Sequence, residues 1–374
     1  MIEPKDLVEA LDELGVDFAC GVPDSLMEPL CTYLATRPDD HHVVAANEGA
    51  AVGIAIGHFL STGKPALVYL QNAGIGNAIN PLVSLADPDV YGIPMLLLVG
   101  WRGQPGAQDE PQHMKQGRLM EPLLDALGLP WTTLPTDRDE AIACLTGALD
   151  EAMERSTPYL LMVQKGTFSS FEGKLSTPAD HTGLPSREDA LIALLETTGD
   201  QVFVVTTGML GRELYEYRER SGLPADRDFL TVGGMGHCSS IALGVARQRR
   251  DREVWCLDGD GSVLMHLGSL AVIANQAPEN LYHVVFNNGV HDSVGGQPTV
   301  MRSVDLPAAA RAFGYQYAAL VSDVSALGDV VGKMRASSGP SLVDLHVRPG
   351  NREGIGRPHR SPAHAKTVFM AGLD

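Results

Sequence analysis

Two polar side chains follow apolar runs of the sequence at the points where those runs end. Asp260 stands in the sequence Gly-Asp-Gly-Ser after the apolar residues 254–257, and Asn288 is the second member of an Asn-Asn pair that follows the apolar residues 284–286. Such runs predict buried parallel strands, whose carboxyl ends meet at the edge where open α/β sheets bind ligands. Glycines there let backbone N–H groups approach a phosphate, and the two oxygen side chains suit a hard cation such as Mg²⁺. The pattern therefore predicts a diphosphate held through a metal ion.

The two motifs together resemble the diphosphate-binding motif of thiamine diphosphate (ThDP) enzymes, in which Gly-Asp-Gly is followed at a similar spacing by Asn-Asn. By that resemblance, Mg²⁺ is bound by the side chains of Asp260 and Asn288 and by the backbone carbonyl of Val290. The cofactor-binding residues implied with them are Gly259, Asp260, Gly261, Ser262 and Asn288. The alternative for Gly-Asp-Gly alone is an ordinary turn after a strand, and the second motif argues against it.

An acidic residue also follows an apolar run in the first half of the chain. Glu48 comes after residues 43–47 and precedes a run of small residues that predicts a helix. A carboxylate in that position is partly removed from water, which raises its pKa and lets it share a proton with a ligand nitrogen. The resemblance implies this role for Glu48 toward N1′ of the ThDP aminopyrimidine. The alternative is a carboxylate at a helix N-terminus that interacts with the helix dipole.

Length and charge narrow the class of protein. A chain of 374 residues is long enough for two domains but leaves little room for the third, middle domain that ThDP decarboxylases usually have. The first residues predict an acidic amphipathic helix rather than a signal peptide, and no apolar run approaches the roughly 18 residues of a membrane span. We therefore expect a cytoplasmic protein without a membrane partner. The formal net charge of −18 argues against nucleic acid as a partner and requires a local Arg or Lys cluster for any anionic substrate.

The cysteines show no Cys-x-x-Cys spacing and lie mostly in apolar contexts. Buried reduced thiols are therefore favoured over zinc ligands or disulfides. The residues concerned are Cys20, Cys31, Cys144, Cys238 and Cys256.

Strand-like and helix-like segments alternate in two blocks, which predicts an α/β fold with two doubly wound parallel sheets. By the family resemblance, residues 1–168 form a pyrimidine-binding domain and residues 186–374 a diphosphate-binding domain, with no middle domain. Residues 169–185, rich in Ser, Thr, Pro and Gly, are expected to link them. The expected strands are residues 18–21, the segment before Glu48, 66–70, 95–99, 159–163, 202–206, 231–232, 254–257, 282–286 and 341–346.

Residues 231–236, which lie between Glu48 and the Gly-Asp-Gly motif, have a further role by resemblance. ThDP must be bent so that its amine reaches the reactive carbon, and the family supports the bend with one bulky apolar residue upstream of the Gly-Asp-Gly motif. Met235 occupies that place, and Gly233 would offer its carbonyl to the pyrimidine amine. The alternative for Met235 is a residue that fills a gap in the core.

Longer runs narrow the resemblance to one branch of the ThDP-dependent decarboxylases, the phosphonopyruvate decarboxylases. These runs are residues 71–81, 100–106, 109–113, 288–299, 356–358, 361–362, 366 and 369–370. The resemblance implies decarboxylation of 3-phosphonopyruvate to phosphonoacetaldehyde and CO₂, a step of phosphonate and antibiotic biosynthesis. Where that branch commonly has Asn-Ser-Gly, this chain has Asn72-Ala73-Gly74, so a role of the serine hydroxyl does not carry over.

A phosphonate calls for cations with several N–H donors, and Arg102 in a Gly-Trp-Arg-Gly loop is the leading candidate. Lysines behind it, such as Lys165, are by default solvated surface charges. The expected substrate-binding residues are Arg102, Asp24, Ser25, Asn72, His113 and Lys165.

Proton transfer requires titratable groups near the substrate. His113 follows an acidic turn, and His291 lies beside Asp292, which can tune the pKa of the ring and orient it. Asp24, at a strand-to-helix turn, either reaches the substrate or caps the helix. The expected catalytic residues are Glu48, His113, His291, Asp292 and Asp24.

Three other functions remain open. Sulfopyruvate decarboxylases have a related architecture and a nearly isosteric substrate. A carboligase of the acetolactate synthase type usually carries the middle domain that this chain has little room for. A nicotinamide-dependent dehydrogenase rests only on the Gly-x-Gly of residues 74–76, which lacks the third glycine. The resemblance also implies a homodimer or larger assembly, in which Glu48 of one chain faces the Gly-Asp-Gly motif of another across the subunit interface.

Overall fold

The computed structural model describes all residues except 174, 176–180 and 374. The chain divides into two compact units, one of Met1–Ser176 with Val294–Gln297 and one of Thr177–Ser293 with Pro298–Asp374. Of the linker expected at residues 169–185, positions 174 and 176–180 lie outside the described residues. Within the described part of the chain, no helix is long and apolar enough to cross a membrane.

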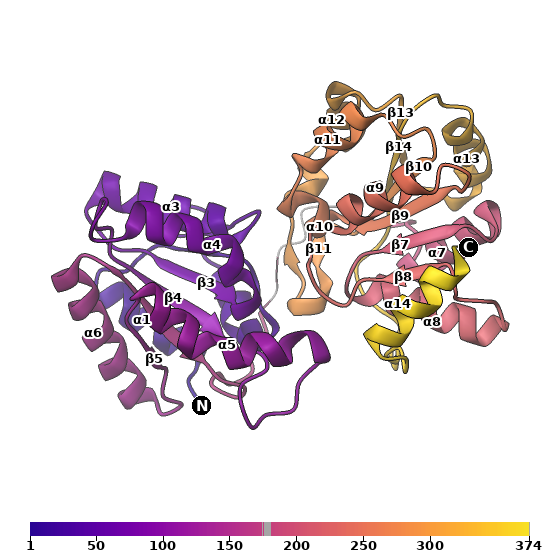
Figure 1. The fold of residues 1–374 in the computed structure, drawn as a ribbon. Coiled ribbons are helices and arrows are strands. Elements are labelled where there is room, and N and C mark those ends of the chain that lie inside the picture. The colour runs from indigo at the N-terminus through magenta and orange to yellow at the C-terminus, as the bar shows by residue number, and fades with distance from the viewer. Residues whose placement is uncertain (174, 176–180, 374) are drawn as a thin grey trace. The chain divides into compact units, whose positions relative to one another are not determined.

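The first unit is a six-stranded parallel sheet in the order β2-β1-β3-β4-β6-β5 with helices on both faces (Figure 1). Alternate residues of β4 pack into two separate cores, as Leu96 and Leu98 do on one face and Leu97 and Val99 on the other. The strands are β1 (Ala19–Gly21), β2 (His42–Val44), β3 (Leu67–Gln71), β4 (Met95–Gly100), β5 (Trp131–Thr133) and β6 (Pro158–Val163). The helices are α1 (Pro4–Glu13), α2 (Glu28–Leu34), α3 (Glu48–Thr62), α4 (Ile75–Pro81), α5 (Pro111–Leu127) and α6 (Arg138–Arg155).

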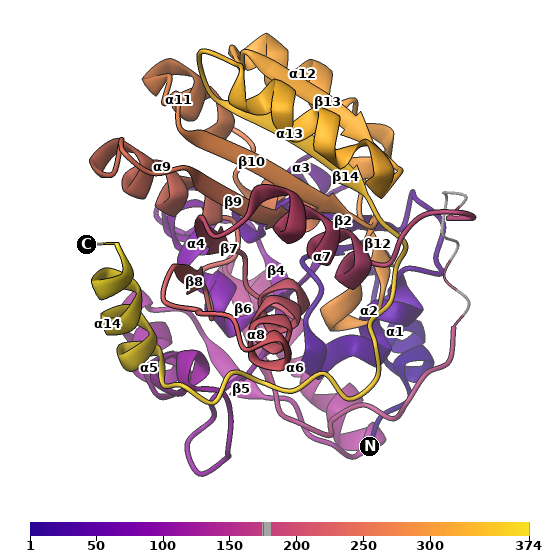
Figure 2. The same cartoon turned by 90° about the vertical axis from the view of Figure 1, so that its right-hand side faces the viewer.

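The second unit is another six-stranded parallel sheet, in the order β13-β14-β10-β9-β7-β8. The last helix, α14, lies beside the edge strand β8 in both views (Figure 1 and Figure 2). The strands are β7 (Val202–Val205), β8 (Asp228–Leu230), β9 (Val254–Gly259), β10 (Leu281–Asn287), β13 (Tyr317–Val321) and β14 (Ser341–His346), with short strands β11 (Val290–His291) and β12 (Gln297–Pro298) after β10. The helices are α7 (Arg187–Thr198), α8 (Met209–Ser221), α9 (Cys238–Gln248), α10 (Asp260–Met265), α11 (Ser269–Gln276), α12 (Leu306–Phe313), α13 (Leu327–Arg335) and α14 (Pro362–Gly372).

The fold prediction of two parallel α/β sheets is confirmed, and most expected strands occur within two residues of their predicted bounds. The strand expected at residues 231–232 is wrong, because β8 comes earlier, at Asp228–Leu230, and residues 231–232 begin the glycine-rich loop that follows. The edge strands β5 and β13 escaped prediction. β5 is three residues long and two of them are threonines, so no apolar run marks it, whereas β13 is the apolar run Tyr-Ala-Ala-Leu-Val, which the sequence reasoning overlooked.

Candidate active site

The Gly-Asp-Gly-Ser motif stands at the junction of β9 and α10. β9 ends at Gly259, which caps α10, and Asp260 is the first helical residue. Only 4% of Asp260 is exposed, and the Thr299 hydroxyl donates a 2.5 Å hydrogen bond to its Oδ2 atom. Burial raises the pKa of the Asp260 carboxyl to about 6, against the lowering effect of the Thr299 hydrogen bond. A cation bound there would hold this carboxyl in its ionised form.

The two Asn residues at the end of β10 have different surroundings. Asn287 donates through Nδ2 to Oδ1 of Asp344 in the neighbouring strand β14, at 3.0 Å. Asn288 lies just beyond the strand, and its Oδ1 accepts from the backbone N–H of Val290 at 3.1 Å. Because β9 and β10 pair in parallel register, the Asn288 loop and Asp260 lie at the same edge of the sheet. Asn287 is thus engaged within the sheet, whereas Asn288 shapes the loop at the edge.

Asp292 does not orient the neighbouring histidine, His291, as expected. Its Oδ2 accepts from Arg187 Nη1 at 3.0 Å and from Asn288 Nδ2 at 2.7 Å, and the backbone N–H of Gly350 donates to both oxygens. Among the described residues, no hydrogen bond joins the His291 ring to Asp292. Burial lowers the pKa of His291 to about 4, so this ring is neutral at pH 7. The expected tuning of His291 by Asp292 is therefore wrong, and Asp292 anchors the Asn288 loop.

The loop that carries Met235 packs on the Gly-Asp-Gly-Ser motif. Ser262 Oγ accepts a hydrogen bond from the backbone N–H of Gly236 at 3.1 Å and another from the Thr206 hydroxyl at 3.1 Å. A Cβ atom added to Gly261 would lie 3.4 Å from Met235 Cε and 3.0 Å from the His291 ring. Met235 and His291 therefore both lie next to Gly261, and a side chain at Gly261 would have to push them away by a few tenths of an ångström. Gly233 is half-buried in the same loop.

In the first unit, Glu48 is the first residue of α3 and is 5% exposed. Asn47 caps this helix, with its Oδ1 accepting from Ala50 N at 2.9 Å, so Glu48 is not the capping group. Burial raises the pKa of Glu48, while a 2.8 Å hydrogen bond from Asn77 Nδ2 to Oε2 opposes that shift. A Cβ atom on Gly74 would lie 2.2 Å from Glu48 Oε1. The chain therefore holds a buried carboxyl against a glycine surface.

Arg102, which lies two residues after the end of β4, forms an ion pair that its sequence motif did not predict. Its Nε and Nη2 atoms donate to the two oxygens of Asp109 at 2.7 and 2.5 Å, and Nη1 donates to Ser25 Oγ at 2.7 Å. This two-point contact holds the pKa of Asp109 down to about 2. Asp109 also accepts from the backbone N–H of Gly103 at 2.8 Å. Arg102 thus has a fixed position and a compensated charge.

Asn72 positions the Arg102 loop, whereas Asp24 is held by its own turn and by Gln71. The amide of Asn72 donates to the backbone carbonyl of Arg102 at 2.8 Å and accepts from its N–H at 3.3 Å. Asp24 is fully buried, and it accepts from Leu26 N at 2.9 Å and from Gln71 Nε2 at 2.8 Å. Of the two roles considered for Asp24, the structure therefore shows the helix cap. Burial raises the pKa of its carboxyl.

His113 and Lys165 lie at the same sheet edge of the first unit, on different elements. His113 is in the first turn of α5, and its buried Nδ1 atom has no hydrogen-bond partner among the described residues. Burial lowers its pKa, and the nearby charge of Arg102 does so further. Lys165 is exposed just after β6.

Comparison with known proteins decides the family. The protein-family model of the thiamine pyrophosphate enzyme N-terminal TPP binding domain matches residues 4–127. The family model of the C-terminal TPP binding domain matches residues 207–345. TPP, thiamine pyrophosphate, is another name for ThDP. Phosphonopyruvate decarboxylase of Streptomyces viridochromogenes is 38% identical over 385 residues, which cover 99% of this chain and 95% of the relative. The chain belongs to the ThDP-dependent decarboxylase family.

Two further relatives of this decarboxylase extend over the whole chain. Phosphonopyruvate decarboxylase of Streptomyces hygroscopicus is 36% identical and covers 99% of this chain and 93% of its own length. Sulfopyruvate decarboxylase of Methanosarcina acetivorans is 29% identical and covers 100% of this chain and 98% of its own length. The resemblance identified from sequence runs is thereby confirmed at the level of the family.

The residues of this decarboxylase fit the cofactor of its family. The side chains of Asp260 and Asn288 and the carbonyl of Val290 offer oxygen only, which is the donor set that Mg²⁺ prefers. Gly261 and Gly74 lack the Cβ atom that would meet His291 and Met235, or the Glu48 carboxyl, so each site carboxyl keeps its place beside a glycine. Glu48, Asp260 and their neighbours would hold ThDP and the metal ion.

Three contributors to the site were missed by the sequence reasoning: Asn77, Asp109 and Thr299. Asn77 and Asp109 lie in runs that resembled the family, but nothing in their spacing joined them to Glu48 or Arg102. Thr299 contacts Asp260 across 39 positions of the chain, and no local signal indicates such a partner.

Proposed function

We propose that the chain decarboxylates 3-phosphonopyruvate to phosphonoacetaldehyde and CO₂, with ThDP and Mg²⁺ as cofactors. The observation that carries this proposal is the 38% identity to a phosphonopyruvate decarboxylase along 99% of the chain. The fixed guanidinium of Arg102 supports it, because a phosphonate is recognised by planar groups with several N–H donors.

ThDP, when bound, supplies an electron sink for the bond that breaks as CO₂ leaves. The residues of the chain bind and orient it. Glu48, whose pKa is raised by burial, shares a proton with the pyrimidine N1′. Asp260, Asn288 and the carbonyl of Val290 would hold Mg²⁺, whose charge would offset that of the diphosphate. Met235 lies next to Gly261 and would support ThDP in the conformation that its chemistry requires.

The product carbon must then receive a proton. His113 and His291 are the proposed groups, because a neutral imidazole can take up a proton from water at one ring nitrogen while it releases the proton of the other. Burial lowers the pKa of both rings, so each is neutral near pH 7 and would act as such a relay. Asp292 acts on this step through the Asn288 loop that it anchors. Ser25 and Asn72 position Arg102, and Lys165 adds an exposed positive charge to an acidic protein.

We also propose that the active enzyme is a homodimer or a larger assembly, with Glu48 of one subunit serving the Asp260 site of another. The experiment mixes an inactive Glu48→Gln chain with an inactive Asp260→Ala chain. If subunits exchange, about a quarter to a half of the sites should be restored, because some sites then combine two intact halves. An active monomer by light scattering would contradict this arrangement.

The substrate is tested by offering 3-phosphonopyruvate, sulfopyruvate and pyruvate to the purified protein with ThDP and Mg²⁺, and measuring CO₂ and aldehyde. We expect turnover of the phosphonate substrate to exceed that of the other two. Sulfopyruvate is the second candidate, because a sulfopyruvate decarboxylase aligns with the whole chain. Preferential turnover of sulfopyruvate would replace the proposal, and turnover of pyruvate into a larger keto acid would indicate a carboligase.

A further inference from the structure

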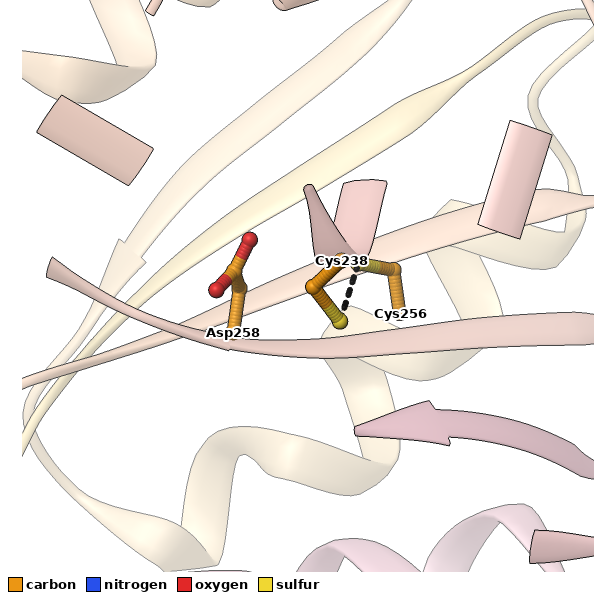
Figure 3. Close-up of side chains that lie close together, drawn as sticks. All are labelled: Cys238, Cys256 and Asp258. Atoms are coloured by element: carbon orange, nitrogen blue, oxygen red, sulfur yellow. Dashed lines mark hydrogen bonds between the residues drawn. The ribbon is translucent and has the colours of Figure 1, made fainter. Parts of the chain in front are cut away.

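A cluster of metal-binding side chains lies in the core of the second unit, beneath the Gly-Asp-Gly-Ser motif. Cys256 and Asp258 lie two positions apart on β9 and therefore project to the same face of the sheet. Cys238 begins α9, which packs on that face, and its sulfur is 3.7 Å from that of Cys256. Figure 3 shows the two sulfur atoms facing each other with the Asp258 carboxylate beside them, and the ligand atoms of all three lie within 4.8 Å of one another.

A fourth group completes the cluster. His283 on β10 pairs in register with Cys256, and its Nε2 atom lies 3.6 Å from Asp258 Oδ2. The ring is 1% exposed, and neither of its nitrogens has a hydrogen-bond partner among the described residues. Buried polar groups are normally satisfied, and Asp is almost never fully buried without a partner. Asp258 Oδ1 accepts a hydrogen bond from the backbone N–H of Gly259 at 3.0 Å, so the unsatisfied group is the His283 ring. An unsatisfied buried histidine beside two sulfurs and a buried carboxylate indicates that a further ligand lies among them.

We propose that Cys238, Cys256, Asp258 and His283 bind one Zn²⁺ ion, separate from the Mg²⁺ of the cofactor. Two thiolates, one imidazole and one carboxylate are a ligand set of the kind that Zn²⁺ takes in tetrahedral sites. Zn²⁺ binding releases two protons, one from each thiol, and leaves the imidazole neutral.

The observed spacings agree with one tetrahedral ion. Two sulfurs bound at about 2.3 Å to the same tetrahedral Zn²⁺ lie about 3.8 Å apart, and the sulfurs of Cys238 and Cys256 are 3.7 Å apart. A nitrogen and an oxygen bound at about 2.0–2.1 Å lie about 3.4 Å apart, and those of His283 and Asp258 are 3.6 Å apart. The ligand atoms of Cys238, Cys256 and Asp258 lie within 4.8 Å of one another, and the His283 side chain would have to rotate to bring a ring nitrogen to the same centre.

The place of the cluster gives the ion a structural role. It joins the start of α9, which follows the Met235 loop, to β9, which ends at Gly259 beside Asp260. The ion would therefore hold two cofactor-binding segments together from below. This prediction differs from the expectation that all five cysteines are buried thiols without a metal.

The test measures zinc in the full-length protein produced with added Zn²⁺ and dialysed against Mg²⁺ and ThDP. We expect about one zinc per chain in the wild type, and below about a tenth in Cys238→Ala and Cys256→Ala. Cys31→Ala, which removes an equally buried thiol in the other unit, is the matched control and should keep its zinc. Asp260→Ala should keep it as well, because that substitution removes the expected Mg²⁺ ligand only.

Wild-type protein loaded with Co²⁺ gives a second measurement, which does not require that the cysteine variants fold. Thiolate ligands produce a charge-transfer absorption that an oxygen-only Mg²⁺ site does not, and we expect that absorption in wild type and Asp260→Ala. Wild-type protein without zinc and without this absorption would overturn the proposal. So would loss of two free thiols under denaturing conditions without reductant, because Cys238 and Cys256 would then form a disulfide.

Discussion

Replacement of Asp260 by Asn is expected to stabilise the cofactor-free protein at pH 7 while it abolishes Mg²⁺-dependent activity. Burial raises the pKa of the Asp260 carboxyl from 3.8 to about 6. The folded state therefore binds this proton more tightly than the unfolded state does, so stability falls as the pH rises from about 4 to about 6. At about 1.4 kcal/mol per pKa unit, the ionised carboxyl costs the folded protein about 3 kcal/mol at pH 7.

Asn carries no charge and removes that cost. The Asn side chain keeps an oxygen for the Thr299 hydroxyl but loses the second carboxylate oxygen. That loss reduces the gain in the free energy of unfolding by about 1 kcal/mol. The expected gain is about 2 kcal/mol, or a rise in Tm of about 4–8 °C for a unit of this size. At pH 5, where the wild-type carboxyl is mostly protonated in the folded state, the electrostatic part of the gain falls to about half.

The assay is urea or thermal unfolding of protein stripped of ThDP and Mg²⁺, at pH 5 and pH 7. Adding Mg²⁺ with ThDP should stabilise the wild type and leave Asp260→Asn unchanged. Thr299→Val is a second variant: it removes a hydrogen bond that lowers the pKa of Asp260, so Mg²⁺ binding should weaken at a higher pH than in the wild type. A gain in Asp260→Asn that is the same at both pH values would refute the reasoning, because it would not come from the buried charge.

The remaining predictions concern the first unit. Gly74→Ala should lower kcat about 10²-fold, because its Cβ would lie 2.2 Å from Glu48 Oε1 and displace the carboxyl. Gly76→Ala is the control: nothing lies within 4 Å of its Cβ, so its kcat should stay within about twofold of the wild type. Equal activity of the two variants in a steady-state assay would contradict this. Glu48→Gln should bind ThDP within a modest factor of the wild type and lose about 10²- to 10⁴-fold in kcat, as measured by calorimetry and turnover; near wild-type turnover would remove Glu48 from proton transfer.

The central strands and their polar ends could be predicted because both follow from local sequence. A buried parallel strand is a continuous apolar run, and the first polar residues after it lie at the ligand-binding edge of the sheet. This reasoning identified the strand ends that carry Asp260, Asn288 and Glu48. It failed for β8, because an edge strand has no such run and Thr231-Val232, before two glycines, resembled a strand end more closely than Asp228–Leu230 did.

Long-range ion pairs could not be predicted in the same way. Asp292 was expected to tune the pKa of His291 and orient its ring because the two residues are adjacent. Adjacent residues at the end of a strand, however, point to different sides. The partner of Asp292, Arg187, is 105 positions away. The partner of Arg102 was equally hard to predict. The chain has a net charge of −18 and many acidic residues, and nothing in the sequence around Arg102 marks Asp109 as the one that pairs with it.

The Arg102 and Asp109 pair determines how a substitution at Arg102 must be tested. Three of the five guanidinium N–H groups donate to Asp109 and Ser25, which leaves two for a substrate. Arg102→Ala is expected to lower kcat/KM for 3-phosphonopyruvate about 10²-fold, with ThDP affinity nearly unchanged. The same substitution also leaves the Asp109 carboxylate without its cation, however, and that carboxylate would repel an anionic substrate by itself.

The Arg102→Ala/Asp109→Ala double variant separates the two causes. If Arg102 contacts the phosphonate, the double variant stays impaired about 10²-fold, whereas recovery to near wild-type kcat/KM would show that Arg102 acts only by neutralising Asp109.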